Sequence, residues 1–184
     1  SRSDIGRAPL ALGALTVGAT VREMSAAYAT FANEGVWREP RLYTKVYNSD
    51  GVLIIDNTQE SRQILGEKAV NYMNYCLYNA ANGGTGGAAL FGGQGIYGKT
   101  GTTSNNRDRW FCGYTDHYTA AVWVAFEMPR ALDNLAGNTY PGYIWQTFMD
   151  ALHEDLPERD FVLYEDDRTV AIVDDALKEK EEVP

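Results

Sequence analysis

Apolar residues recur at helical spacing in three segments of the chain. In residues 20–35, Thr20 and Glu23 form a T-x-x-E capping box, and four apolar residues follow on one face: Val21, Met24, Tyr28 and Phe31. Two further segments, at about 67–82 and about 142–152, carry apolar residues at the same spacing. The pattern therefore predicts three helices.

Other segments have the composition of strands. "RLYTKVY", "NSDG" and "VLIID" predict a hairpin over residues 41–56, and "WFCGY" and "TAAVWVAFE" predict two strands joined by the turn "TDHY". Since "TAAVWVAFE" is apolar on both faces, it is expected to lie centrally in a covered sheet. The glycine-dense residues 83–98 predict no regular element. The order of elements favours an α+β fold with helices packed on an antiparallel sheet.

Composition is consistent with one domain and an appendage. The 184 residues are 45% apolar, and no apolar run approaches the roughly 20 residues that span a bilayer. From Glu154 onward there are twelve acidic and four basic residues, which account for −8 of the net charge of −9. We therefore expect a folded portion over 1–153 and an acidic extension or linker over 154–184. Neither offers a basic surface, so nucleic acid is not an expected partner. The chain opens with Ser1 rather than Met and is expected to begin inside a longer protein.

The sequence gives little support for a metal site or for a Ser-His-Asp triad. Cys76 and Cys112 show no C-x-x-C spacing and are expected to be buried thiols, although a disulfide between them stays open. The two histidines, His117 and His153, have no pattern of a Ser-His-Asp triad around them. No metal site is predicted.

The stretch "GGQGIYGKTGTT" fits two incompatible motifs. Gly93 to Thr100 spells G-x-x-x-x-G-K-T, the phosphate-binding loop of nucleotide triphosphatases. Such a loop needs a buried strand before it and a helix after it. The preceding "GGTGGAALFG" is a poor strand, and the following "GTTSNNRD" opposes helix initiation. The nucleotide-binding module is therefore kept only as an alternative.

The same residues also contain the K-T-G strand of enzymes that attack peptides and β-lactams with a serine: Lys99, Thr100, Gly101, Thr102 and Thr103. This motif needs a sheet edge on which a peptide can pair as an added strand. Lys99 would supply positive charge for a carboxylate and for the proton relay. Gly101 would leave space for close approach. Thr102 would offer a hydroxyl to the carboxylate and a backbone N–H to a developing oxyanion. The segments before and after this strand are both compatible with the K-T-G interpretation.

The wider run "GKTGTTSNNRDRWFCGYT" closely resembles the C-terminal signature of penicillin-binding proteins. The matches are Gly98 to Thr103, Asp108, Trp110-Phe111 and Gly113 to Thr115. Upstream, "AYATFANEG" and "GGTGGAA" are also similar to segments of this family, so that the likeness runs from about Ala8 to Leu152. It is strongest to the class A, bifunctional cell-wall synthases. Phe111 and Trp110 are expected to pack, Asp108 to order the turn, and Arg109 to be a solvated charge.

The family's nucleophile motif S-x-x-K is absent from this chain. None of the six serines has a lysine three residues later, and Ser104-Asn105-Asn106 spells S-x-N only where the family does not keep that element. The resemblance therefore implies the C-terminal part of a transpeptidase domain. It would supply Lys99, Thr100, Gly101, Thr102 and Thr103 for substrate binding and no catalytic residue, and it would be inactive alone.

By resemblance, the intact protein would be a peptidoglycan D,D-transpeptidase. It would transfer an acyl group from D-Ala-D-Ala and would be acylated by β-lactam antibiotics, without metal or cofactor. The serine would lie in the upstream half of the domain, the chain's expected partner. The protein would work in the bacterial cell envelope, on the extracytoplasmic face of the cytoplasmic membrane. A fragment of a penicillin-recognising hydrolase or sensor, and a purely structural partner for the missing half, stay open as alternatives.

Overall fold

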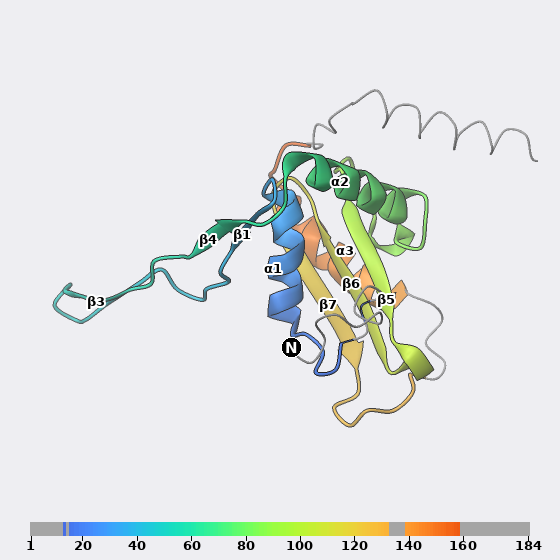
Figure 1. Ribbon diagram of the computed structural model, residues 1–184, viewed down its shortest axis with the longest axis horizontal. Coiled ribbons are helices and arrows are strands. Elements are labelled where there is room, and N and C mark those ends of the chain that lie inside the picture. Colours follow the sequence, from blue (N-terminus) through green and yellow to red (C-terminus); the bar gives the residue numbers. More distant parts are fainter. Residues whose placement is uncertain (1–12, 14, 133–138, 159–184) are drawn as a thin grey trace, which may run out of the picture.

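The computed structural model describes residues 13, 15–132 and 139–158 (Figure 1). Its helices are α1 (Val21–Ala32), α2 (Glu67–Asn82) and α3 (Thr139–His153), with short 3₁₀ helices η3 (Gly87–Ala89) and η4 (Ser104–Asn106). Its strands are β1 (Val36–Arg38), β2 (Lys45–Tyr47), β3 (Leu53–Asp56), β4 (Ser61–Gln63), β5 (Tyr97–Thr102), β6 (Asp108–Tyr114) and β7 (Thr119–Ala125). Within these residues no helix is long and apolar enough to cross a bilayer.

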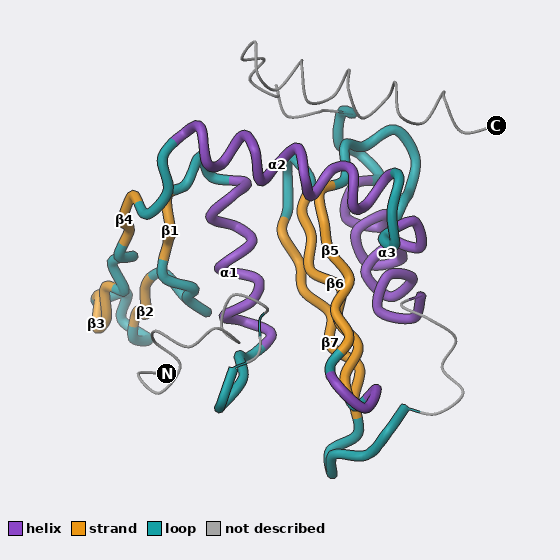
Figure 2. The backbone as a smooth tube through the Cα atoms, turned by 45° about the vertical axis from the view of Figure 1, so that its right-hand side comes forward, coloured by secondary structure: helices purple, strands orange, loops and turns teal. Residues whose placement is uncertain are grey.

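The main sheet is antiparallel, with strand order β5-β6-β7. Helix α1 lies on one face and α3 on the other, while α2 crosses one end of the sheet and contacts β5 (Figure 2). The predicted α+β fold with helices on an antiparallel sheet is confirmed. The prediction that "TAAVWVAFE" is the central strand is wrong, because in this sheet β6 lies between the other two. Both faces of β7 are apolar because α1 and α3 pack on opposite sides of it.

Two hydrophobic clusters fill the two faces of the main sheet. On the α1 side, Tyr97 and Tyr114 stack with their ring centroids 5.4 Å apart, and Tyr28 and Phe31 of α1 pack beside them. On the α3 side, Phe111 meets Trp145 edge to face at 5.1 Å. Neighbouring strand residues point to opposite faces, so β6 contributes Phe111 to one cluster and Tyr114 to the other.

The remaining strands form two narrow ribbons. Strand β2 pairs with β3, which confirms the predicted hairpin within shorter bounds, and β1 pairs with β4. The second pairing was not predicted, because three-residue strands are too short to show alternation. Together they form an arm, β1–β4 with β2–β3, that extends away from the main sheet (Figure 1).

Local signals set the helix ends. Thr20 caps α1 as predicted: its hydroxyl accepts from the Glu23 N–H at 3.2 Å, and the Glu23 carboxylate accepts from the Thr20 N–H at 2.8 Å. The Glu23 carboxylate accepts from the Thr20 N–H and also from the Thr20 hydroxyl at 2.7 Å, and these two bonds lower the pKa of Glu23. Helix α2 has the predicted bounds, whereas α3 begins three residues before the predicted 142.

The two cysteines are free thiols in different environments. Cys112 is buried, as predicted, but Cys76 is exposed, which contradicts the prediction. Helix α2 buries Val70, Asn74, Leu77 and Ala81, and Cys76 lies off that face. Burial raises the pKa of the Cys112 thiol to about 12.

Candidate functional site

The five K-T-G residues lie at one edge of the main sheet. Lys99 to Thr102 belong to β5, and Thr103 follows as the residue that precedes η4. In the described part of the chain no strand pairs with the outer side of β5. The expected edge position of this strand is therefore confirmed.

The register determines which backbone groups point outward. Thr102 pairs with Arg109, and the next residue along the strand, Thr103, donates its backbone N–H to the Asp108 carbonyl at 3.2 Å. Antiparallel residue pairs alternate between hydrogen-bonded and non-hydrogen-bonded, so Gly101 and Lys99 also direct their backbone groups toward β6. The backbone N–H and C=O groups of Thr100 and Thr102 consequently point away from β6, to the outer edge.

The Lys99 side chain is exposed and lies along that edge. Its ammonium donates to the Thr100 carbonyl at 3.0 Å and lies 3.4 Å from the Thr100 hydroxyl oxygen. A fixed positive charge thus stands beside the outward backbone groups of β5. Carboxylates bind favourably at such positions through charge-assisted hydrogen bonds.

Glycines let β5 and β6 close over the Phe111 ring. A Cβ on Gly98 would lie 2.6 Å from Phe111 Cζ, and one on Gly113 would lie 2.8 Å from the Tyr97 carbonyl oxygen. At Gly101 a Cβ would lie 3.1 Å from Trp110 Cβ. Side chains at these positions would push the strands apart or shift the edge that carries Lys99.

The turn after β5 is held by Asp108, as predicted. The Thr103 hydroxyl donates to the Asp108 carboxylate at 2.8 Å and accepts from the Asp108 N–H at 3.0 Å. The Trp123 indole N–H donates to the other carboxylate oxygen at 2.8 Å. Asp108 therefore ties the end of the K-T-G strand to β7.

Arg109 is not the solvated charge that was predicted. It is only 6% exposed, because it lies on β6, the middle strand, opposite Thr102. Its Nη1 donates to Asn106 Oδ1 at 3.3 Å, and its Nε has no hydrogen-bond partner. The neighbouring Phe111 is fully buried, so its expected packing role is confirmed.

Sequence reasoning missed one residue at this edge. The Thr85 hydroxyl lies 2.6 Å from the Thr100 hydroxyl, from the loop between α2 and η3. The available signal was the "GGTGG" pattern, in which a lone hydroxyl stands among glycines.

The histidines form a separate cluster at the β6–β7 turn. His153 Nε2 lies 2.8 Å from the Thr115 hydroxyl, which accepts from the His117 N–H at 3.2 Å. This cluster holds the turn against the end of α3. Among the described residues, no group of three His, Cys, Asp or Glu is arranged to hold a metal ion.

The phosphate-loop geometry is not present. Gly98, Lys99 and Thr100 lie within β5 rather than in a loop before a helix, and the next element is the 3₁₀ turn η4. The amides that would surround a phosphate are instead in an extended strand. The nucleotide-binding alternative is therefore not favoured.

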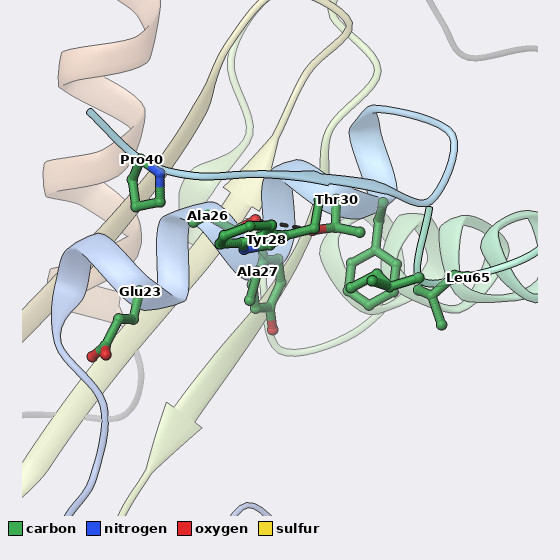
Figure 3. A pocket seen from close by; sticks show the side chains of 10 residues that line it. Glu23, Ala26, Ala27, Tyr28, Thr30, Pro40 and Leu65 are labelled. Atoms are coloured by element: carbon green, nitrogen blue, oxygen red, sulfur yellow. Dashed lines mark hydrogen bonds between the residues drawn. The ribbon is translucent and has the colours of Figure 1, made fainter. Parts of the chain in front are cut away.

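A cavity of about 330 Å³ lies elsewhere, between α1 and the arm. Its walls are mostly apolar, with Tyr28 and Phe31 on the α1 side and Trp37, Pro40 and Leu65 on the arm side (Figure 3). None of the residues that line it belongs to β5.

Comparison with known proteins places the chain in a family. The sequence model of the penicillin binding protein transpeptidase domain matches residues 2–150. The chain therefore belongs to the penicillin-binding protein transpeptidase domain family, and relatives named penicillin-binding protein 1A place it with the class A members. One of these, from Clostridium acetobutylicum, is 37% identical over 155 residues, which cover 83% of this chain and 19% of that protein.

Solved structures agree with this assignment. The penicillin-binding protein PonA1 from Mycobacterium tuberculosis aligns with a TM-score of 0.68 and 28% identity, over 77% of this chain and 40% of that one. Penicillin-binding protein 1A from Haemophilus influenzae has the same fold, with a TM-score of 0.75 and 22% identity over 89% of this chain and 30% of that one. The chain spans about a fifth of the length of the curated relatives it matches.

Proposed function

We propose that this chain is the C-terminal part of a transpeptidase domain and forms the K-T-G wall of its acyl-transfer site. The intact protein is a peptidoglycan D,D-transpeptidase. Its serine attacks the D-Ala-D-Ala carbonyl, an acyl-enzyme bond forms, and the terminal D-Ala leaves with a proton. The amine of a second stem peptide then takes the acyl group and restores the serine. The observation that carries this proposal is the Lys99 ammonium beside an edge strand whose Thr100 and Thr102 backbone groups face outward.

The edge of β5 suits a peptide that ends in a carboxylate. An extended stem peptide pairs with the outer side of β5 as an added strand. Lys99 attracts the carboxylate, and the Thr100 and Thr102 hydroxyls donate to it. The Thr102 N–H, which points away from β6, donates to the oxyanion that forms as the serine attacks. A β-lactam carries an acyl group and a carboxylate of the same kind and binds in the same place.

The serine, its general base and the second oxyanion donor come from the polypeptide upstream of this chain. The cavity between α1 and the arm supports such a partner, since an open apolar surface of this kind favours association. The arm exposes further apolar residues, with Leu42 87% and Ile54 61% exposed. The assembled protein works in the cell envelope, at the extracytoplasmic face of the membrane.

Complementation tests the proposal. This chain is co-expressed with the polypeptide encoded immediately upstream, penicillin is added, and both pieces are weighed by intact-mass spectrometry. We expect one penicillin on the upstream piece and none on this chain. Lys99→Ala should slow acylation by roughly a hundredfold, the effect of losing charge-assisted hydrogen bonds to a carboxylate. Lys45→Ala, a lysine on the arm, should leave the rate unchanged.

Two results would contradict the proposal. One is a covalent adduct on this chain, which would place a nucleophile within it. The other is a stably assembled pair that Lys99→Ala does not affect. In that case the β5 edge would not be the carboxylate site.

A further inference from the structure

We propose that Thr85 is a positioning residue for the carboxylate site, and that its hydroxyl orients the Thr100 hydroxyl next to Lys99. This inference rests on the proposed function. It assigns a role to the loop between α2 and η3, which contributes no residue to the K-T-G motif itself.

The side chains of Thr85, Thr100 and Lys99 form a continuous series of hydrogen bonds. Thr85 and Thr100 are joined hydroxyl to hydroxyl at 2.6 Å, and the Lys99 ammonium lies 3.4 Å from the same Thr100 oxygen. Thr100 is only 8% exposed, whereas Thr85 is exposed to solvent. Thr85 is therefore the outer neighbour of a largely buried hydroxyl.

The Lys99 ammonium determines which groups donate and which accept in this series of hydrogen bonds. An ammonium has only donors, so Thr100 Oγ1 is the acceptor for Lys99. The second lone pair of Thr100 Oγ1 accepts from the Thr85 hydroxyl, so the Thr100 proton is left to donate to a bound carboxylate. Hydrogen bonds in such a series strengthen one another. Without the Thr85 oxygen, the Thr100 hydroxyl loses its fixed rotamer, and its alignment toward a bound carboxylate is lost with it.

The loop is built to hold Thr85 in place. A Cβ on Gly84 would lie 2.9 Å from the Ala80 carbonyl oxygen, and one on Gly86 would lie 2.8 Å from Ala81 Cα. These glycines let the loop pack against the last turn of α2. The Gly86 N–H donates to the Ala80 carbonyl at 3.0 Å. Side chains on either glycine would lift Thr85 away from Thr100.

A second contact fixes the loop relative to the strand. The Asn82 side-chain amide, at the end of α2, donates to the Ile96 carbonyl at 3.0 Å. Ile96 immediately precedes β5 and is fully buried. Helix α2 and strand β5 are thus joined next to the Thr85–Thr100 pair, so the pair is a product of the packing and not a chance contact of a mobile loop.

The test uses the assembled pair and two probes, penicillin and its carboxylate methyl ester. We expect Thr85→Val to lower the second-order acylation constant for penicillin by roughly three- to tenfold, the effect of one hydrogen bond. The slower reaction of the ester should change little, because it lacks the charge that the site aligns with. Thr85→Ser keeps the oxygen and should restore most of the penicillin rate. Thr58→Val, at an exposed threonine on the arm, is the matched control.

The outcomes separate this inference from the proposed function. If Lys99→Ala slows acylation and Thr85→Val leaves it unchanged, only the role of Thr85 is refuted. Equal slowing of both probes by Thr85→Val would reduce Thr85 to a structural contact and refute its role as well. If Lys99→Ala has no effect, the proposed function fails first. Should Thr85→Val weaken assembly, Thr85→Ala takes its place with the same expectations.

Discussion

The main sheet and the arm are both antiparallel β-structures, but they bury their apolar residues very differently. In the main sheet, strands of six or seven residues lie between α1 and α3, and Phe111, Tyr114 and Trp145 are fully buried. In the arm, strands of three or four residues leave apolar side chains such as Leu42 and Ile54 largely exposed.

This difference shows that apolar residues serve two purposes in the chain. Those of the main sheet hold this chain's own fold, since each fully buried large side chain contributes roughly 1.5–3 kcal/mol. The exposed ones of the arm, such as Leu42 and Ile54, are not covered by the described residues, and in our proposal they face the rest of the domain. Four substitutions or conditions test that contrast.

The largest effect is expected at Trp145, in the cluster on the α3 side. Trp145→Ala should lower the free energy of unfolding by about 3–5 kcal/mol, because it removes a fully buried ring and leaves a cavity beside Phe111. It also leaves the Ala120 carbonyl without the indole N–H that donates at 3.1 Å. Urea denaturation of the chain measures the loss. Tyr143→Ala, on the exposed face of the same helix, should cost less than about 1 kcal/mol; equal losses would refute the two-cluster description.

A smaller loss is expected from closing the space between β5 and β6. Gly113→Ala places a methyl group 2.8 Å from the Tyr97 carbonyl oxygen and 3.2 Å from Gly98 Cα. Backbone atoms cannot rotate away, so the cost should be about 1–3 kcal/mol. Gly87→Ala, where nothing lies within 4 Å, is the control. Similar stabilities for the two variants, from thermal unfolding, would count against the tight approach of the strands.

Alkaline pH should weaken the main sheet selectively. Burial raises the pKa of Cys112 from 9.0 to about 12, and burial also raises the pKa values of Tyr28 and Tyr114. Below pH 9 the thiol is protonated in both the folded and the unfolded chain, so its titration takes nothing from the free energy of unfolding. Between pH 9 and 12 the unfolded chain loses it first, so stability falls as pH rises.

The thiol's share of this fall can be isolated. From pH 8 to pH 10, Cys112 should account for about 1 kcal/mol of lost stability. Urea denaturation at both values, in a Cys76→Ala background, should show a smaller pH dependence once Cys112→Ala is added. An unchanged slope would mean that the thiol titrates alike in both states.

The smallest effect on stability is expected in the arm. Ile54→Thr changes a side chain that is 61% exposed and should shift the free energy of unfolding of this chain by less than about 0.5 kcal/mol. In the co-expressed pair, the same substitution should weaken assembly, measured by analytical ultracentrifugation. A large loss in the chain alone would show that the arm packs against it after all.

Local signals in the sequence predicted much of the fold. The Thr20–Glu23 capping box, the 67–82 helix and the hairpin at 41–56 depend on neighbours within a few residues, and all three are confirmed. The edge position of the K-T-G strand was also predicted, because a peptide can pair with this strand only where no other strand does.

What the sequence left unpredicted depends on distant contacts. The burial of Arg109 follows from β6 being the middle strand, a place for which the sequence favoured β7 because β7 is apolar on both faces. The exposure of Cys76 depends on which side of α2 meets β5. Thr85 could not be placed beside Thr100 because a glycine-dense loop has no periodicity, and only the packing of that loop on α2 fixes its path.

The lysine on the edge of β5 has a consequence for solubility. A bare edge strand is a template on which a second copy of the same protein can pair and aggregate, and charged side chains, lysine above all, discourage that pairing. Two copies that meet edge to edge along β5 would bring their Lys99 ammonium groups together, and the repulsion opposes the contact. A peptide that ends in a carboxylate meets attraction at the same place. One positive charge can thus protect the protein from its own copies while leaving the edge open to a chain of opposite charge.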